Sequence, residues 1–78
     1  MSKQVHIQQR INRISGQLKG IDNMITQQRE CKDILLQINA IKAAINNLGL
    51  ELAKGELCKV APGDSQTVNQ ILTEVSRL

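Results

Sequence analysis

The sequence predicts an all-α protein, a protomer of three helices whose two long helices pair with a second copy in an antiparallel four-helix-bundle dimer. The chain has 78 residues with only one Pro and five Gly, too few for the turns of a hairpin-rich β protein. Its apolar residues recur at steps of three and four, the period of a helix face. It lacks Phe, Trp and Tyr, and so short a chain buries a marginal core that usually needs a partner subunit.

The first helix is expected at about residues 3–28. Its apolar residues alternate steps of four and three, which is a heptad seam: Ile7, Ile11, Ile14, Leu18, Ile21 and Ile25. Gly16 and Gly20 interrupt this helix at a cost of about 1 kcal/mol each relative to Ala. Because they lie on one face, we expect another backbone to approach them closely. Residues 27–30 are expected to form a turn.

The second helix is expected at about residues 31–59 and the third at about residues 65–77, within a single domain of residues 1–78. The second seam has the same spacing as the first: Ile34, Ile38, Ile41, Ile45, Leu48 and Leu52. Pro62 and Gly63 are expected to end the second helix, and Asp64 or Ser65 to cap the third. Two narrow seams cannot enclose a core within one protomer, so two antiparallel hairpins are expected to share one.

The charge is unevenly distributed along the chain. The formal net charge is +3, yet residues 1–20 contain four basic residues and no acid: Lys3, Arg10, Arg13 and Lys19. A basic first helix on a near-neutral body is typical of proteins that bind polyanions, with nucleic acid favoured over a membrane surface. A solvated basic face is the alternative interpretation.

Other function classes have little support in the sequence. No apolar run approaches the ~18 residues of a membrane span, so we expect a cytoplasmic protein without membrane association. The chain has one His, no phosphate-binding loop and no Ser-His-Asp set, so we do not expect an enzyme.

Two segments carry a family resemblance, RINRISGQLKGI at residues 10–21 and CKDILLQINAIK at residues 31–42. Together they resemble the copper-sensing operon repressor family, which includes the CsoR, RcnR, FrmR and CstR proteins. The resemblance implies a homodimer that assembles into a disc-shaped homotetramer and represses transcription by binding double-stranded operator DNA. A metal ion or the modification of a thiol then releases the DNA. The positions that match the family's DNA face are Arg10, Arg13, Gln17 and Lys42.

The sensor site departs from the copper pattern of that family. Copper-sensing members use a Cys at the start of the second helix and, near its end, a His and a second Cys. Cys31 matches the first ligand, but Glu56 and Val60 occupy the other two positions, so the trigonal Cu(I) site cannot be assembled. The one histidine, His6, lies in the first helix and is favoured as a solvent-facing or DNA-facing residue over a ligand. No cofactor is therefore predicted with certainty, and Cu(I) stays the metal alternative.

The two cysteines favour thiol chemistry. Cys31 and Cys58, without a histidine partner, resemble the persulfide-sensing CstR branch, whose inducers are reactive sulfur species. Cys31 starts a helix between Arg29 and Lys32, which favours a nucleophilic thiolate, whereas Glu30 and Asp33 oppose it. On one straight helix the 27 residues from Cys31 to Cys58 are 7.5 turns, so the thiols would point to opposite sides unless Gly55 bends the helix.

Within one chain the two sulfurs would lie about 40 Å apart, so the only disulfide we expect is Cys31 to Cys58 between protomers. Three alternatives stay open. The same family includes sensors of Cu(I) and of other metals. The two thiols can also be buried small apolar side chains in a reducing cytosol. From a different class, the chain can be a structural or adaptor helical bundle that binds a protein partner.

Overall fold

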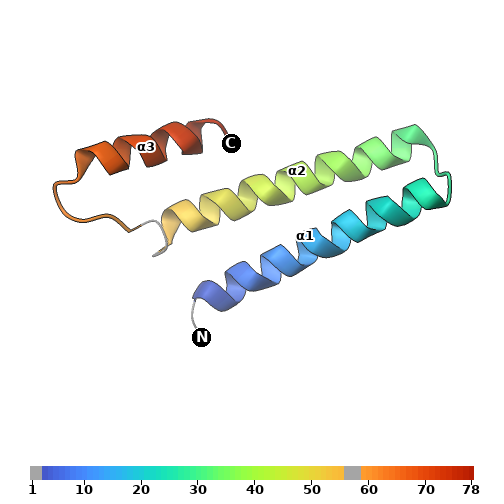
Figure 1. Ribbon diagram of the computed structural model, residues 1–78, viewed down its shortest axis with the longest axis horizontal. Helices are drawn as coiled ribbons and strands as arrows, with labels where there is room; N and C mark the ends of the chain where they lie inside the picture. Colours follow the sequence, from blue (N-terminus) through green and yellow to red (C-terminus); the bar gives the residue numbers. More distant parts are fainter. Residues whose placement is uncertain (1–2, 56–58) are drawn as a thin grey trace.

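The protein is described by a computed structural model that covers residues 3–55 and 59–78, and these ranges form three α-helices (Figure 1). Helix α1 (Lys3–Thr26) and helix α2 (Cys31–Lys54) form an antiparallel hairpin. Helix α3 (Ser65–Ser76) runs back towards α2, and only its C-terminal end lies beside α2, on the side away from α1. The Cα positions span 53 × 29 × 12 Å, so the protomer is a single layer of helices. The predicted all-α class and helix order are confirmed.

The turn between α1 and α2 is a Schellman motif without its usual glycine. Gln28 has a φ of 56°, and the N–H of Arg29 donates to the carbonyl oxygen of Met24 at 2.9 Å. The N–H of Gln28 donates to the carbonyl oxygen of Ile25 at 3.1 Å. The left-handed residue ends α1 at Thr26, two residues before the predicted boundary.

Helix α2 ends at Lys54, not near residue 59 as the sequence predicted. Gly55 is extended, with φ −92° and ψ −173°, and its N–H donates to the carbonyl oxygen of Leu52 at 3.1 Å. Because α1 and α2 both have 24 residues, α2 stops opposite the start of α1, where α1 no longer offers a surface to pack against. Pro62 therefore does not end α2, and Gly63, with φ 84°, belongs to the turn before α3.

Helix α3 begins with the predicted cap. Asp64 is the N-cap residue, and its carboxylate accepts a hydrogen bond from the N–H of Thr67 at 3.1 Å. Hydrogen bonding to Thr67 lowers the pKa of the Asp64 carboxyl from its ordinary value of 3.8, because the ionised form is the better acceptor.

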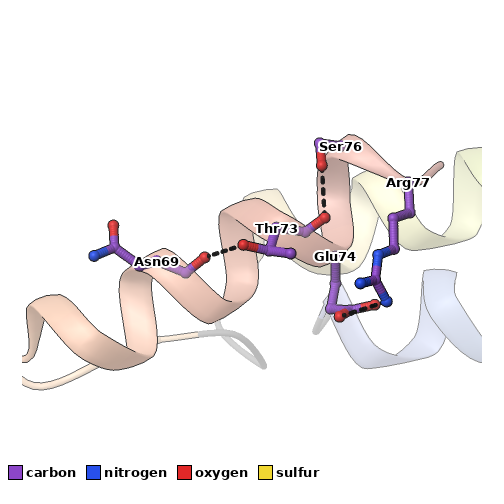
Figure 2. A network of polar contacts seen from close by, with 5 residues as sticks. All are labelled: Asn69, Thr73, Glu74, Ser76 and Arg77. Atoms are coloured by element: carbon purple, nitrogen blue, oxygen red, sulfur yellow. Dashed lines mark hydrogen bonds and ion pairs between the residues drawn. The ribbon is translucent and has the colours of Figure 1, made fainter.

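The other end of α3 has a network of local polar contacts (Figure 2). The hydroxyl of Thr73 donates to the carbonyl oxygen of Asn69 at 2.9 Å, and the hydroxyl of Ser76 donates to the carbonyl oxygen of Thr73 at 2.6 Å. Arg77 pairs with Glu74 at 3.4 Å. These contacts stay within α3, which ends at Ser76, one residue before the predicted boundary.

The core of the described part of the chain is very small. Only Ile14 and Ile41 are buried, at 9% and 5% exposure. The chain exposes 6243 Å², whereas a compact protein of 8.7 kDa exposes about 4,700 Å². None of the described helices is long and apolar enough to span a membrane.

Helix α3 touches α2 through its C-terminal end. A Cβ added at Gly49 would lie 2.9 Å from Cδ1 of Leu78, so the missing side chain leaves room for that contact. By contrast, a Cβ added at Gly16 or Gly20 would meet nothing within 4 Å among the described residues. The predicted close approach of a second backbone to these two glycines is therefore not made within the protomer.

Candidate nucleic-acid interface and sensor site

The seam of α1 divides into two stripes with different surroundings. Ile7, Ile14 and Ile21 are buried or half-buried, and they recur every seven residues on the side that faces α2. The other half of the seam is exposed, with Leu18 at 54% and Ile25 at 59%. Only alternate members of the predicted seam therefore pack inside the hairpin.

The residues on either side of Ile14 differ in polarity. At 100° per residue, Ile11 and Leu18 lie on one flank of Ile14, whereas Arg10 and Gln17 lie on the other. In α2 the same steps from buried Ile41 place Ile38 and Ile45 on one flank and Gln37, Ala44 and Glu51 on the other. We call the exposed stripes the apolar face: Ile11, Leu18, Ile25, Ile38 and Ile45.

A contact between the two helices fixes which flanks adjoin. The guanidinium of Arg10 lies 4.0 Å from the carboxylate of Glu51, so the polar flanks of α1 and α2 share one side of the hairpin. We call this side the polar face: Arg10, Gln17, Gln37 and Glu51. The apolar face consequently occupies the opposite side.

The four predicted DNA-contacting residues do not all lie together. Arg13 is exposed on α1 and follows Arg10 by three residues, so it extends the polar face outward. Lys42 is exposed on α2 but precedes Glu51 by nine residues, which is two and a half turns. Lys42 thus lies on the opposite side of α2 from Glu51, and one protomer does not bring it beside the two arginines.

Gln17 is half-buried, unlike Arg13. Its carbonyl oxygen Oε1 is buried and has no hydrogen-bond partner in the described part of the chain. The acceptor atom of this side chain is therefore turned away from solvent.

Cys31 is the first residue of α2, and its thiol is free and exposed. It precedes Ile38 and Ile45 by seven and fourteen residues, so it lies at the end of the apolar face. The neighbouring Arg29 pairs with Asp33 at 4.0 Å. The structure therefore shows that the cation near Cys31 has an acidic partner, Asp33, one of the two acids that the sequence indicated as opposing a thiolate.

The remaining predicted sensor positions follow α2 in the sequence. Cys58 and Glu56 lie outside the described residues, and Val60 is half-buried in the segment before α3. Because α2 ends at Lys54 and Gly55 is extended, the helix is interrupted at Gly55, which is the alternative that the sequence left open, and the orientation of Cys58 relative to Cys31 stays a prediction. His6 is exposed on α1, and no three His, Cys, Asp or Glu side chains gather within residues 3–55 and 59–78.

Sequence reasoning also missed Glu51. Nothing in the local pattern around Glu51 distinguishes it from other charged residues of an exposed helix face. The one available signal was its position three residues after Leu48, on the flank that Ala44 and Gln37 share.

Comparisons with known proteins cover nearly the whole chain for a family model and somewhat more than half of it for single relatives. The family model described as "Metal-sensitive transcriptional repressor" matches residues 3–78. The copper-sensing transcriptional repressor CsoR of Bacillus subtilis (strain 168) is 50% identical over 46 residues, which are 59% of this chain and 46% of that protein. The copper-sensing transcriptional repressor RicR of Mycobacterium tuberculosis (strain ATCC 25618 / H37Rv) is 40% identical over 43 residues, 55% of this chain and 45% of that protein.

The transcriptional repressor RcnR of Escherichia coli (strain K12) is 40% identical over 48 residues, 62% of this chain and 53% of that protein. The chain spans about half the length of the curated relatives it matches. No solved structure matches it.

The fold and the two faces define a helical-hairpin protein that carries a polar surface opposite an apolar one. The match over residues 3–78 then shows that the chain belongs to the metal-sensitive transcriptional repressor family. The predicted resemblance is confirmed at the level of this family. The family consists of transcriptional repressors, not enzymes, in agreement with the sequence interpretation. The relatives named above are copper sensors and RcnR, so the persulfide-sensing branch stays a prediction.

Proposed function

We propose that this protein is a transcriptional repressor that binds double-stranded operator DNA in the cytoplasm and releases it when an inducer acts at Cys31. The observation that carries the proposal is the division of the hairpin into two faces. Arg10 and Arg13 lie on the polar side of α1, opposite the apolar face. The polar side of the hairpin thus presents arginines to an anion, while the apolar face is suited to a contact between subunits.

The apolar face supports a homodimer. The protomer exposes about 1,500 Å² more than a compact protein of its mass, and a standard interface buries about 800 Å² per partner. Two antiparallel hairpins joined through Ile11, Leu18, Ile25, Ile38 and Ile45 would complete a four-helix bundle. The homotetramer rests on the family resemblance and would carry a formal charge of 4 × 3 = +12.

The charge pattern supports binding through phosphates. Arg13 is exposed and has no acidic partner within 4.0 Å among the described residues. Guanidinium groups contact phosphate oxygens in two-pronged geometry, and each neutralised phosphate makes affinity more sensitive to salt. We therefore expect affinity to fall steeply as the salt concentration rises.

The proposed inducer is a reactive sulfur species. The Cys31 thiolate would attack one sulfur of a polysulfide, its S–S bond would break, and the shortened polysulfide would leave with the electron pair. The Cys58 thiolate of the partner subunit would then attack Sγ of Cys31 in the persulfide, so that the bond from Sγ to the outer sulfur breaks, hydrosulfide leaves and a disulfide links the subunits. Support comes from the exposed thiol of Cys31 and from Val60 and Glu56, which are not soft metal ligands.

A second candidate function is the sensing of Cu(I) by the same repressor. It is favoured by the names of two relatives, both called copper-sensing transcriptional repressors. Cys31 would be one ligand, and the other ligands would have to come from outside the family's usual positions. A candidate from another class is an adaptor bundle that binds a protein through the apolar face.

The deciding experiment is native mass spectrometry of the protein after anaerobic exposure to polysulfide and, separately, to one equivalent of Cu(I). The proposal expects crosslinked dimers after polysulfide, with added sulfur in any longer links, and none in Cys31→Ser. A stoichiometric Cu(I) adduct without sulfur links would instead favour the metal sensor. If Cys31→Ser retained full inducer-dependent release of DNA, the assignment of Cys31 would be wrong. Binding to DNA that does not change with salt would favour the adaptor.

A further inference from the structure

The polar face contains an acid beside the arginine that the proposed function uses. The carboxylate of Glu51 lies 4.0 Å from the guanidinium of Arg10, and the two side chains are 44% and 39% exposed. Arg10 lies in the first third of α1, while Glu51 lies in the last turn of α2. The pair therefore joins two helices through residues that are 41 positions apart in the sequence.

Solvent exposure determines what this pair can do. An exposed ion pair contributes only about 0–1 kcal/mol, so its contribution to the stability of the hairpin is small. For the same reason it opens easily when another anion approaches. A phosphate that reaches the guanidinium of Arg10 meets a carboxylate already in the same position, and the two negative groups repel each other.

The neighbouring arginine offers an internal comparison. Arg13 lies one turn further along α1 and has no acidic partner within 4.0 Å among the described residues. The two arginines on this side of α1 are thus unequal, since Arg13 is available to an anion and Arg10 is paired with Glu51.

We propose that Glu51 is a built-in competitor of the nucleic acid, so that the Arg10–Glu51 pair is an autoinhibitory contact. The inference rests on the proposed function, because it assumes that Arg10 contacts DNA phosphate. In the free protein Glu51 neutralises Arg10, and DNA binds by displacing that carboxylate. Glu51 thereby lowers the affinity of the polar face for DNA and reduces the contribution of Arg10 to the free energy of DNA binding.

A double-mutant cycle tests the competition directly. The affinity for a short, fluorescently labelled DNA duplex is measured by anisotropy in a salt series for wild type, Glu51→Gln, Arg10→Gln and the double variant. Glu51→Gln is expected to tighten binding about two- to fivefold for each protomer that contacts the duplex. Arg10→Gln is expected to weaken binding, and Glu51→Gln should have no further effect once Arg10 is absent.

Glu74→Gln is the matched control, since it removes the same charge from an exposed ion pair in α3. Three results would refute the competition. Glu51→Gln could leave the affinity for DNA unchanged, or it could tighten binding no more than Glu74→Gln does. It could also tighten binding equally in the Arg10→Gln background. Helicity by circular dichroism checks each variant, and Glu51→Ala replaces Glu51→Gln if the latter unfolds. If the wild type did not bind the duplex in a salt-dependent manner, the proposed function would fail as well. Salt-dependent wild-type binding with an unaffected Glu51→Gln would overturn the competition alone.

Discussion

Leu18→Ala tests whether the apolar face is a subunit interface. Leu18 is 54% exposed in the protomer, so a partner that covers it would bury about half of a leucine side chain. Complete burial of a leucine contributes roughly 1.5–3 kcal/mol, and half of that is about 1 kcal/mol per protomer. Because a two-fold symmetric dimer contains the substitution in both protomers, the loss occurs twice. We therefore expect Leu18→Ala to weaken the dimer by about 2 kcal/mol, or about thirtyfold in Kd.

Sedimentation equilibrium over a range of protein concentrations measures this Kd. Leu72→Ala is the matched control, because Leu72 is 59% exposed but belongs to α3, outside the apolar face. The control should leave the dimer Kd within about twofold of wild type, as expected for a residue outside the contact. A dimer Kd of Leu18→Ala equal to that of wild type, or an equal loss in Leu72→Ala, would refute the assignment of the interface.

Three further predictions concern single residues. Gln28→Gly should stabilise the fold by about 1 kcal/mol, because glycine adopts the positive φ of this turn without a Cβ penalty; chemical denaturation measures it, and a loss of stability would contradict it. The Asp64 cap should stabilise α3 above the ordinary carboxyl pKa of 3.8 and lose this effect as the pH falls through the lowered pKa. A pH titration of helicity that is identical in Asp64→Ala would argue against that cap. Arg13→Ala should weaken DNA binding and reduce the salt slope by about one. Unchanged affinity and slope would leave Arg13 a purely structural residue.

The fold was largely predictable because its signals are local. The helical period of the two seams, the turn at residues 27–30 and the cap at Asp64 all depend on residues within a few positions of each other. The end of α2 was not predictable in this way. The hydrophobic pattern and Pro62 placed it near residue 59, whereas α2 ends at Lys54, where α1 no longer offers a surface to pack against.

The candidate site was predictable in part. Arg13 and Cys31 are exposed, as contact with DNA and with an inducer requires, and both roles stay predictions. Lys42 was predicted to share a surface with Arg10, but its position on α2 places it on the other side within one protomer. A heptad pattern alone does not reveal this, because it shows which residues of one helix share a stripe and not where that stripe points.

The sequence by itself determined the helices, their order, the heptad spacing and the family, because each of these depends on residues that are close together along the chain. Only the tertiary structure decided which alternate residues of each seam turn inward, so that Ile14 and Ile41 are buried while Leu18 and Ile45 are exposed. It also decided that Arg10 meets Glu51. The physical reason is that the rotation of a helix about its own axis is set by the neighbour it packs against, and that neighbour is distant in sequence.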